Sequence, residues 1–142
     1  MNKLIQKLKR LGNLTTGYGG ETRTEAVHKG VDVANASGTP IPNMAKGIVT
    51  AIKTGQVQGS KGYGNSVIIK TKNGDSYRYS HLRDVLVKPG QKVPEGKKIG
   101  TMGDSGNTYS PTGGDGSHLD LRILDAYGKY RDPSAKKLRT KK

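Results

Sequence analysis

The sequence contains no cysteine, no tryptophan and no phenylalanine. Without cysteine the chain has neither a disulfide framework nor a thiolate zinc site. Apolar residues make up 31% of the 142 residues, so valine, isoleucine, leucine and seven tyrosines must build the core of a chain whose length is typical of one domain. No apolar run approaches the roughly 20 residues of a transmembrane segment, and we expect none. The first residues also lack the continuous apolar stretch of a secretory signal, so we expect no signal peptide.

Acidic residues are scarce as well: 11 stand against 25 lysines and arginines, which gives a formal charge of +14. The basic residues gather at the ends, with four in residues 1–10 and seven in residues 129–142, where only one acid accompanies them. Such a balance favours an anionic partner, for instance wall polymers, an acidic membrane surface or nucleic acid; soluble, solvated ends explain it equally well. Because no nucleic-acid motif is present, we expect no specific nucleic-acid partner.

The apolar pattern predicts one short helix followed by many strands. Helical spacing of apolar residues predicts a helix over residues 3–11. Short apolar runs separated by glycine predict strands at residues 48–52, 67–69, 76–82, 86–87, 99–102 and 119–123, and Asn73-Gly74 predicts a tight hairpin. The expected fold is therefore all-β, a small antiparallel barrel or sandwich with a short N-terminal helix. We expect a basic amphipathic segment at residues 1–12, the main domain at 13–133 and a basic tail at 134–142.

The three histidines lie in suggestive local contexts, although a lone histidine is more often structural than a ligand. His28 precedes Asp32 by four residues with Gly30 between them, and a glycine allows a tight backbone on which both side chains converge. His118 precedes Asp120 by two residues within the alternating run 118–123. Residues two apart in a strand share a face, so this second pair projects together while the leucines between them face the core.

These nitrogen and oxygen donors are numerous enough for a zinc site without thiolates. Such a site needs three protein ligands and an open fourth position for water. His81, the third histidine, ends the predicted strand 76–82. Tyr79 lies two residues before it and is expected on the same strand face, lining the cleft.

Several segments occur in an order that is similar to one known family. They are Thr-Gly-Tyr-Gly at 16–19, His-Lys-Gly-Val-Asp at 28–32, Gly-Tyr-Gly-Asn at 62–65, Tyr-Ser-His-Leu at 79–82, the spaced glycines and valines of 87–100, and His-Leu at 118–119. Residues 15–133 thereby resemble the lysostaphin-like zinc metallopeptidases (murein endopeptidases), which degrade peptidoglycan. The lysostaphin-like fold, the duplicated hybrid motif, is implied by the same resemblance.

The resemblance also implies roles for individual residues. His28 and Asp32 match metal ligands, His118 matches the general base that acts with the metal-bound water, and His81 matches the histidine that stabilises the oxyanion. The third ligand of the family is the second histidine of a His-x-His motif, and Asp120 stands there instead, as the expected third ligand. Two further matching residues, Arg23 and Asn65, are expected to contact substrate together with Tyr79.

Asp120 is the main departure from the family pattern. A carboxylate ligates zinc at roughly 2.0–2.2 Å, so it is a competent donor. One histidine and two carboxylates neutralise the ion, however, which weakens its action on water and carbonyl. Oxygen ligands also favour other ions, so the expected cofactor is Zn²⁺ with Mn²⁺ or Ca²⁺ as alternatives. A second departure is the extended loop 104–117 beside the expected cleft.

The sequence thus predicts a metal-dependent endopeptidase that hydrolyses peptide bonds of bacterial peptidoglycan, in a stem peptide or a cross-bridge. Its partners would be peptidoglycan peptides, anionic wall polymers and, because no signal peptide is seen, other proteins of a phage virion or tail. The expected location is the extracellular cell wall or the virion. The alternative is an inactive relative that binds cell wall or serves as a structural virion component.

Two other functions compete less well. Residues 88–100 resemble a biotinyl or lipoyl carrier, but the sequence shows no Met-Lys-Met or comparable acceptor lysine. A nucleic-acid binder is suggested by charge alone.

Overall fold

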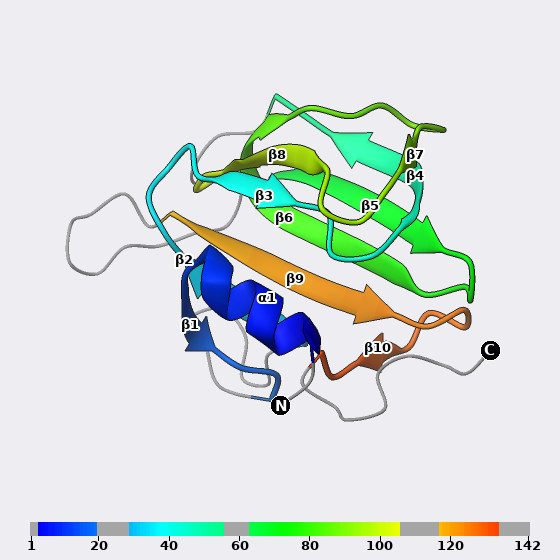
Figure 1. Ribbon diagram of the computed structural model, residues 1–142, viewed down its shortest axis with the longest axis horizontal. Helices are drawn as coiled ribbons and strands as arrows, with labels where there is room; N and C mark the ends of the chain where they lie inside the picture. Colours follow the sequence, from blue (N-terminus) through cyan, green and yellow to red (C-terminus); the bar gives the residue numbers. More distant parts are fainter. Residues whose placement is uncertain (1–2, 20–28, 56–62, 106–116, 134–142) are drawn as a thin grey trace.

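A computed structural model describes residues 3–19, 29–55, 63–105 and 117–133 of the chain. In these ranges one helix is followed by ten strands (Figure 1). The elements are α1 (Lys3–Leu11), β1 (Asn13–Thr16), β2 (Val31–Ala34), β3 (Pro40–Pro42), β4 (Gly47–Lys53), β5 (Asn65–Thr71), β6 (Ser76–Val85), β7 (Lys92–Val93), β8 (Lys98–Met102), β9 (His118–Leu124) and β10 (Tyr130–Arg131). The prediction of an all-β fold with a short N-terminal helix is confirmed.

The described strands form one open antiparallel sheet. Its main order is β1-β2-β9-β6-β5-β4-β7, while β10 pairs with β9, and β3 pairs with β8. The long strand β6 belongs to two arms of this sheet. It pairs with β9 from Ser76 to Ser80 and with β8 from Leu82 to Val85. In Figure 1, β3 and β8 are drawn above β9, with the label of β6 between them. Within the described ranges the two edge strands β1 and β7 do not pair, so the sheet is not closed into a barrel.

His81 lies where β6 changes partners. Its φ is +64°, which makes it the one residue other than glycine with a positive φ among those described. Few residues with a side chain adopt this left-handed conformation, so it marks a constrained position. The His81 amide leaves the ladder and donates to the Tyr63 carbonyl at 2.8 Å. The strand therefore turns at the residue that the sequence singles out for chemistry.

The core lies between α1 and the sheet and continues between the two arms. Leu4, Ile5, Leu8 and Leu11 of α1 are buried, and the helix packs beside β1 and β2. Burial of such a side chain stabilises the fold by about 1.5–3 kcal/mol, so a helix that would be marginal in isolation is held by its packing. Within the described ranges, no helix is long and apolar enough to cross a membrane.

The predicted strands at 48–52, 67–69, 76–82, 99–102 and 119–123 are all present, with longer bounds. The hairpin between β5 and β6 is confirmed, although residues 72–75 connect the strands instead of two residues, and Gly74 has a φ of +94°. The prediction of a strand at 86–87 is wrong. These residues follow the end of β6, where Leu86 is 50% exposed and Val87 is a buried core residue.

Candidate functional site

Neighbouring strands place two carboxylates side by side on the face of the sheet that points away from the core. Asp32 in β2 is the cross-strand partner of Asp120 in β9, which in turn is opposite Ser80 in β6. Leu119 and Leu121 alternate with Asp120 and are fully buried on the core side, as the sequence predicts. Asp32 and Asp120 are only 9% and 3% exposed. The site therefore holds two buried acidic groups in direct register.

Two histidines meet beside this pair of carboxylates. The rings of His81 and His118 lie with their centroids 4.8 Å apart and tilted by 41°. His118 begins β9, is opposite Ala34, and its amide donates to the Gly103 carbonyl at 3.0 Å. His81 is 6% exposed, whereas His118 is half-buried. The fold thus brings both predicted catalytic residues together and leaves His118 as the more accessible ring.

The environment of His81 fixes how its ring is used. Its Nδ1 lies 2.7 Å from the carbonyl oxygen of Ser105, which only accepts hydrogen bonds, so Nδ1 carries the proton. Burial, followed by the nearby His118, lowers the pKa of His81 below its ordinary value, although Ser105, Asp120 and Asp32 partly oppose this. The neutral ring therefore presents the lone pair of Nε2, which lies 4.0 Å from Oδ2 of Asp120.

Asp120 is paired with an arginine on the same strand face. Arg122 donates from Nε to both carboxylate oxygens, at 3.1 and 3.2 Å, and from Nη2 to Oδ2 at 2.9 Å. Arg122 is itself only 7% exposed. Hydrogen bonds between charged groups are stronger than those between neutral groups, and this geometry engages the full width of the guanidinium edge. Both oxygens of Asp120 therefore already have a cationic partner.

Two tyrosines hold the other side of the Arg122 guanidinium. Its Nη1 donates to the Tyr63 hydroxyl at 3.2 Å, and its central carbon lies 4.9 Å from the Tyr63 ring centroid and 6.0 Å from that of Tyr130. Arg78, the cross-strand partner of Arg122, covers the same Tyr63 ring at 4.5 Å. The Tyr63 hydroxyl, followed by the two arginines, lowers the pKa of Tyr130. Cation–π contacts and hydrogen bonds thus immobilise Arg122.

Gly30 is needed for a different reason from the one predicted. A Cβ at this position would lie 2.5 Å from the Leu121 carbonyl oxygen, 2.6 Å from Cγ of Arg122 and 2.8 Å from Oδ1 of Asp120. Its φ is not in the positive range. The glycine therefore permits close approach of β9 and its ion pair to the start of β2, and it does not form a left-handed turn.

The remaining predicted residues divide into two groups. His28 and Arg23 lie outside the described residues. Asn65 is 7% exposed, and its Nδ2 donates to the carbonyls of Leu82 and Arg83 at 2.9 and 3.3 Å, so it ties β5 to β6.

The prediction that Tyr79 lines the cleft does not fit its position. Its side chain is fully buried, its hydroxyl donates to Oδ1 of Asn43 at 2.9 Å, and it accepts from the Met44 amide at 2.8 Å. The strand alternation that suggested a shared face with His81 is broken by the positive φ of His81. Tyr79 is therefore a core residue.

Within the predicted metal-ligand set of His28, Asp32 and Asp120, the described contacts bear on Asp120. Among the residues that the structure describes, no three histidine, cysteine, aspartate or glutamate side chains are grouped to hold an ion, and His28 is not among those residues. The decisive observation concerns Asp120, because its two oxygens accept three hydrogen bonds from Arg122. Asp120 is thus the partner of a buried guanidinium, which does not fit its predicted role as the third ligand.

Sequence reasoning missed Arg122, Tyr63 and Ser105. The alternation of residues 118–123 already places Arg122 on the face of Asp120, so opposite charges two residues apart on a strand were the available signal. Tyr63 and Ser105 reach the site from distant parts of the chain, and no local pattern marks them.

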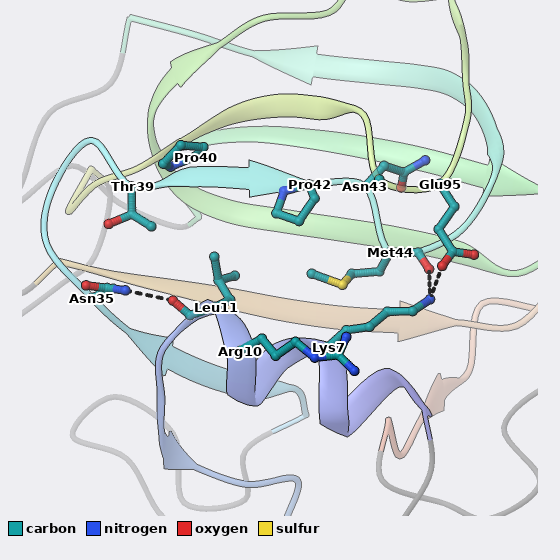
Figure 2. Close-up of a pocket in the computed structure, with 11 residues that line it drawn as sticks. Lys7, Arg10, Leu11, Asn35, Thr39, Pro40, Pro42, Asn43, Met44 and Glu95 are labelled. Atoms are coloured by element: carbon teal, nitrogen blue, oxygen red, sulfur yellow. Dashed lines mark hydrogen bonds and ion pairs between the residues drawn. The ribbon is translucent and has the colours of Figure 1, made fainter.

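A separate cavity of about 510 Å³ lies between α1 and β3, away from the histidine pair (Figure 2). In Figure 2, Lys7 of α1 reaches across it to the carbonyl of Met44 and the carboxylate of Glu95. None of the residues His81, His118, Asp32 or Asp120 lines this cavity. It is thus distinct from the site described above.

Solved structures share this fold. The catalytic domain of lysostaphin from Staphylococcus simulans is 26% identical, with a TM-score of 0.73 over 90% of this chain and 92% of that chain. A mutant catalytic domain of the prophage-encoded M23 protein EnpA from Enterococcus faecalis is 26% identical, with a TM-score of 0.71 over 88% and 91%. A zinc-containing peptidase from Vibrio cholerae is 25% identical, with a TM-score of 0.75 over 92% and 38%.

Curated relatives resemble the chain in sequence. Peptidoglycan DD-endopeptidase ShyA of Vibrio cholerae is 37% identical over 103 residues, which cover 72% of this chain and 21% of that protein. Murein hydrolase activator NlpD of Escherichia coli K12 is 36% identical over 85 residues, which cover 60% and 21%. The chain therefore spans about a fifth of the length of these relatives. Residues 26–133, most of the chain, match the family described as Peptidase family M23. The chain belongs to peptidase family M23, the lysostaphin-like family.

Proposed function

We propose that this chain takes the peptide part of bacterial peptidoglycan beside His81 and His118 and hydrolyses it as an endopeptidase. The observation that carries the proposal is the imidazole pair, with centroids 4.8 Å apart, next to two carboxylates in cross-strand register. Two proton-accepting rings beside buried acids form an arrangement suited to proton transfer near a peptide bond. The 37% identity to a peptidoglycan DD-endopeptidase supports the choice of substrate.

The two histidines would have different roles. His118 is half-buried and starts its strand, so it is the ring that substrate reaches and the proposed general base. His81 holds its proton at Nδ1 against the Ser105 carbonyl, so its neutral ring offers only an acceptor at Nε2. The oxyanion-stabilising role implied by resemblance requires a donor, and hence requires His81 in its protonated form.

Zinc belongs to the proposal on the strength of the family and of a structural neighbour described as zinc-containing. Within the proposal, His28 and Asp32 would contribute ligands to the ion. Asp120 does not fit the third ligand position while it is paired with Arg122, and no step of the reaction is assigned to a metal. Manganese and calcium remain the proposed alternatives.

A second candidate function is recognition of peptidoglycan without hydrolysis. The specific observation in its favour is the Asp120–Arg122 pair, which engages the residue at the third ligand position. A relative that is 36% identical over 85 residues is named a murein hydrolase activator, and not a hydrolase. This candidate shares the substrate of the first and differs in the outcome of binding.

Location and partners follow from the proposed substrate. We propose the cell wall as the place of action, with anionic wall polymers as contacts of a chain that carries a formal charge of +14. A phage virion, with other virion proteins as partners, is the second proposed location. Its support is the similarity to the catalytic domain of a prophage-encoded M23 protein.

The test compares the release of soluble peptides from purified cell walls by the unmodified chain and by His118→Ala. Tyr127→Ala is the matched control. Tyr127 is 89% exposed and follows the C-terminal end of β9, whereas His118 is the first residue of that strand. We expect release by the unmodified chain and the control, and about a 100-fold or greater loss in the variant. Co-sedimentation with walls is measured in parallel. Binding without release by the unmodified chain favours the second candidate, while neither binding nor release contradicts both.

A further inference from the structure

The carboxylate of Asp120 is already paired with the guanidinium of Arg122, a cation that belongs to the chain itself. We infer that Arg122 competes with a divalent metal ion for Asp120, so that the unmodified chain keeps this site stable without metal and binds metal there more weakly than a chain lacking the guanidinium. Competition at Asp120 follows from its ion pair with Arg122 and is expected whether or not the chain hydrolyses peptidoglycan.

The geometry of the pair leaves no convenient approach for an ion. A carboxylate offers about four lone-pair positions, and three hydrogen bonds from Arg122 converge on the two oxygens of Asp120. A metal ion would need an oxygen at roughly 2.0–2.2 Å, which would place it against the positive guanidinium. Because two cations on one buried carboxylate repel each other strongly, metal binding requires Arg122 to move.

Movement of Arg122 is itself opposed by the surrounding side chains. The guanidinium lies between Asp120 on one side and the ring and hydroxyl of Tyr63 on the other, and Tyr130 lies 6.0 Å away. Arg122 and Asp120 are 7% and 3% exposed, so water does not replace the lost contacts easily. Separating such a buried pair leaves an uncompensated charge, which is strongly unfavourable.

The neighbouring Asp32 explains why a cation is needed at all. Asp32 and Asp120 are direct cross-strand partners, and like charges directly opposite each other destabilise a sheet. Both are buried, which strengthens the repulsion. A metal ion would relieve it by binding both. Arg122 relieves it from within the chain, so the pair of carboxylates is stable in the absence of any ion.

Arg78 provides a matched control for the test. It is the cross-strand partner of Arg122, and both guanidinium groups contact the Tyr63 ring, at 4.5 and 4.9 Å. Of these two arginines, Arg122 is the one that is hydrogen-bonded to Asp120. Arg122→Gln and Arg78→Gln therefore remove the same charge from the same aromatic contact, but only the first releases the carboxylate.

The experiment is isothermal titration of chelator-treated protein with zinc chloride, without any substrate. We expect Arg122→Gln to bind zinc about tenfold or more tightly than the unmodified chain, and Arg78→Gln to match the unmodified chain. The double variant Asp120→Asn/Arg122→Gln should lose the gain, because the released carboxylate is its source. The melting temperature of the unmodified chain should not fall when chelator is added.

The inference is overturned if Arg122→Gln binds zinc no more tightly than the unmodified chain. This holds whether both proteins bind zinc tightly or neither binds it detectably. Equal gains in the Arg122 and Arg78 variants also overturn it, because the effect would then be one of net charge. Near-ultraviolet circular dichroism checks that each variant is folded. Should Arg122→Gln not fold, Arg122→Lys takes its place. A lysine keeps the charge but lacks the forked guanidinium, and a smaller gain in zinc affinity is expected of it.

Discussion

Both faces of β9 carry buried side chains, and these are held in different ways. On the core face, Leu119, Leu121 and Ile123 have no exposed area and contact other apolar side chains. On the opposite face, Asp120 and Arg122 are 3% and 7% exposed and are joined by three hydrogen bonds. The core face is stabilised without directional contacts by removal of apolar area from water, whereas the other face depends on one matched pair of charges.

This difference predicts that the two faces of β9 tolerate substitutions unequally. A core side chain is replaceable by another apolar group of similar volume at small cost. A buried ion pair tolerates the loss of both members better than the loss of one, because a single remaining charge has neither water nor partner. Adjacent positions on one strand are therefore expected to respond to substitution by different rules.

The largest effect is expected at the ion pair. Asp120→Ala leaves the buried Arg122 without its carboxylate and should lower the free energy of unfolding by about 3–5 kcal/mol. Urea unfolding followed by circular dichroism measures it. The double variant Asp120→Leu/Arg122→Met should recover most of the loss, because it removes both charges. A double variant as unstable as the single one would contradict the view that unpaired charge is the cause.

A slightly smaller effect is expected on the core face one residue away. Leu121→Ala removes a fully buried side chain and leaves a cavity, which costs about 2–4 kcal/mol. Leu121→Met, with a similar volume, should cost less than about 1.5 kcal/mol. The same unfolding measurement applies. If Leu121→Met is as unstable as Leu121→Ala, the stability of the core face depends on the exact shape of the side chain and not on apolar burial alone.

A third substitution tests a polar group placed inside the core. Tyr79→Phe keeps the ring but removes a hydroxyl that accepts from the Met44 amide and donates to Asn43. The buried Met44 amide loses its acceptor, whereas Oδ1 of Asn43 still accepts from the Ala45 amide at 3.3 Å, and we expect a loss of about 1–2 kcal/mol in the free energy of unfolding. Because Tyr79 has no exposed area, wall binding by the folded variant should be unchanged. If the folded Tyr79→Phe variant bound cell walls more weakly than the unmodified chain, Tyr79 would have to contact the substrate, which contradicts its assignment to the core.

The smallest effect is expected at an exposed ion pair across the cavity of Figure 2. Lys7 and Glu95 are paired, but their side chains are 27% and 54% exposed, in contrast to Arg122 and Asp120. Glu95→Gln should change the free energy of unfolding by less than about 1 kcal/mol, and added salt should reduce even this. A loss as large as that of Asp120→Ala would show that exposure does not separate the two pairs.

Most of the fold could be predicted from local patterns. Apolar spacing located α1 and the long strands β4, β5, β6, β8 and β9 because these segments carry enough residues for a period to be read. β2 was missed because Val31 and Val33 alternate over only four residues. β3, β7 and β10 have two or three residues each, and their pairing depends on distant strands that a sequence does not display.

Four members of the site could be predicted from the sequence, but their contacts could not. Resemblance and spacing identified His81, His118, Asp32 and Asp120, which the fold brings together. They could not show that Arg122 binds Asp120, since the same alternation is compatible with an arginine that points to solvent. Burial and the hydrogen bond to Tyr63 hold Arg122 against Asp120 instead of in solvent, and Tyr63 is 59 residues away in the chain.

The left-handed backbone of His81 affects how any substitution there must be interpreted. Alanine at this position removes the ring and also carries a side chain in a conformation that disfavours it, so reduced activity would mix chemistry with a distorted corner. Glycine accepts a φ of +64° without strain and asparagine tolerates it, so these two replacements separate the contributions. Because β6 serves two arms of the sheet, its corner residue shapes the strand as well as supplying a reactive group.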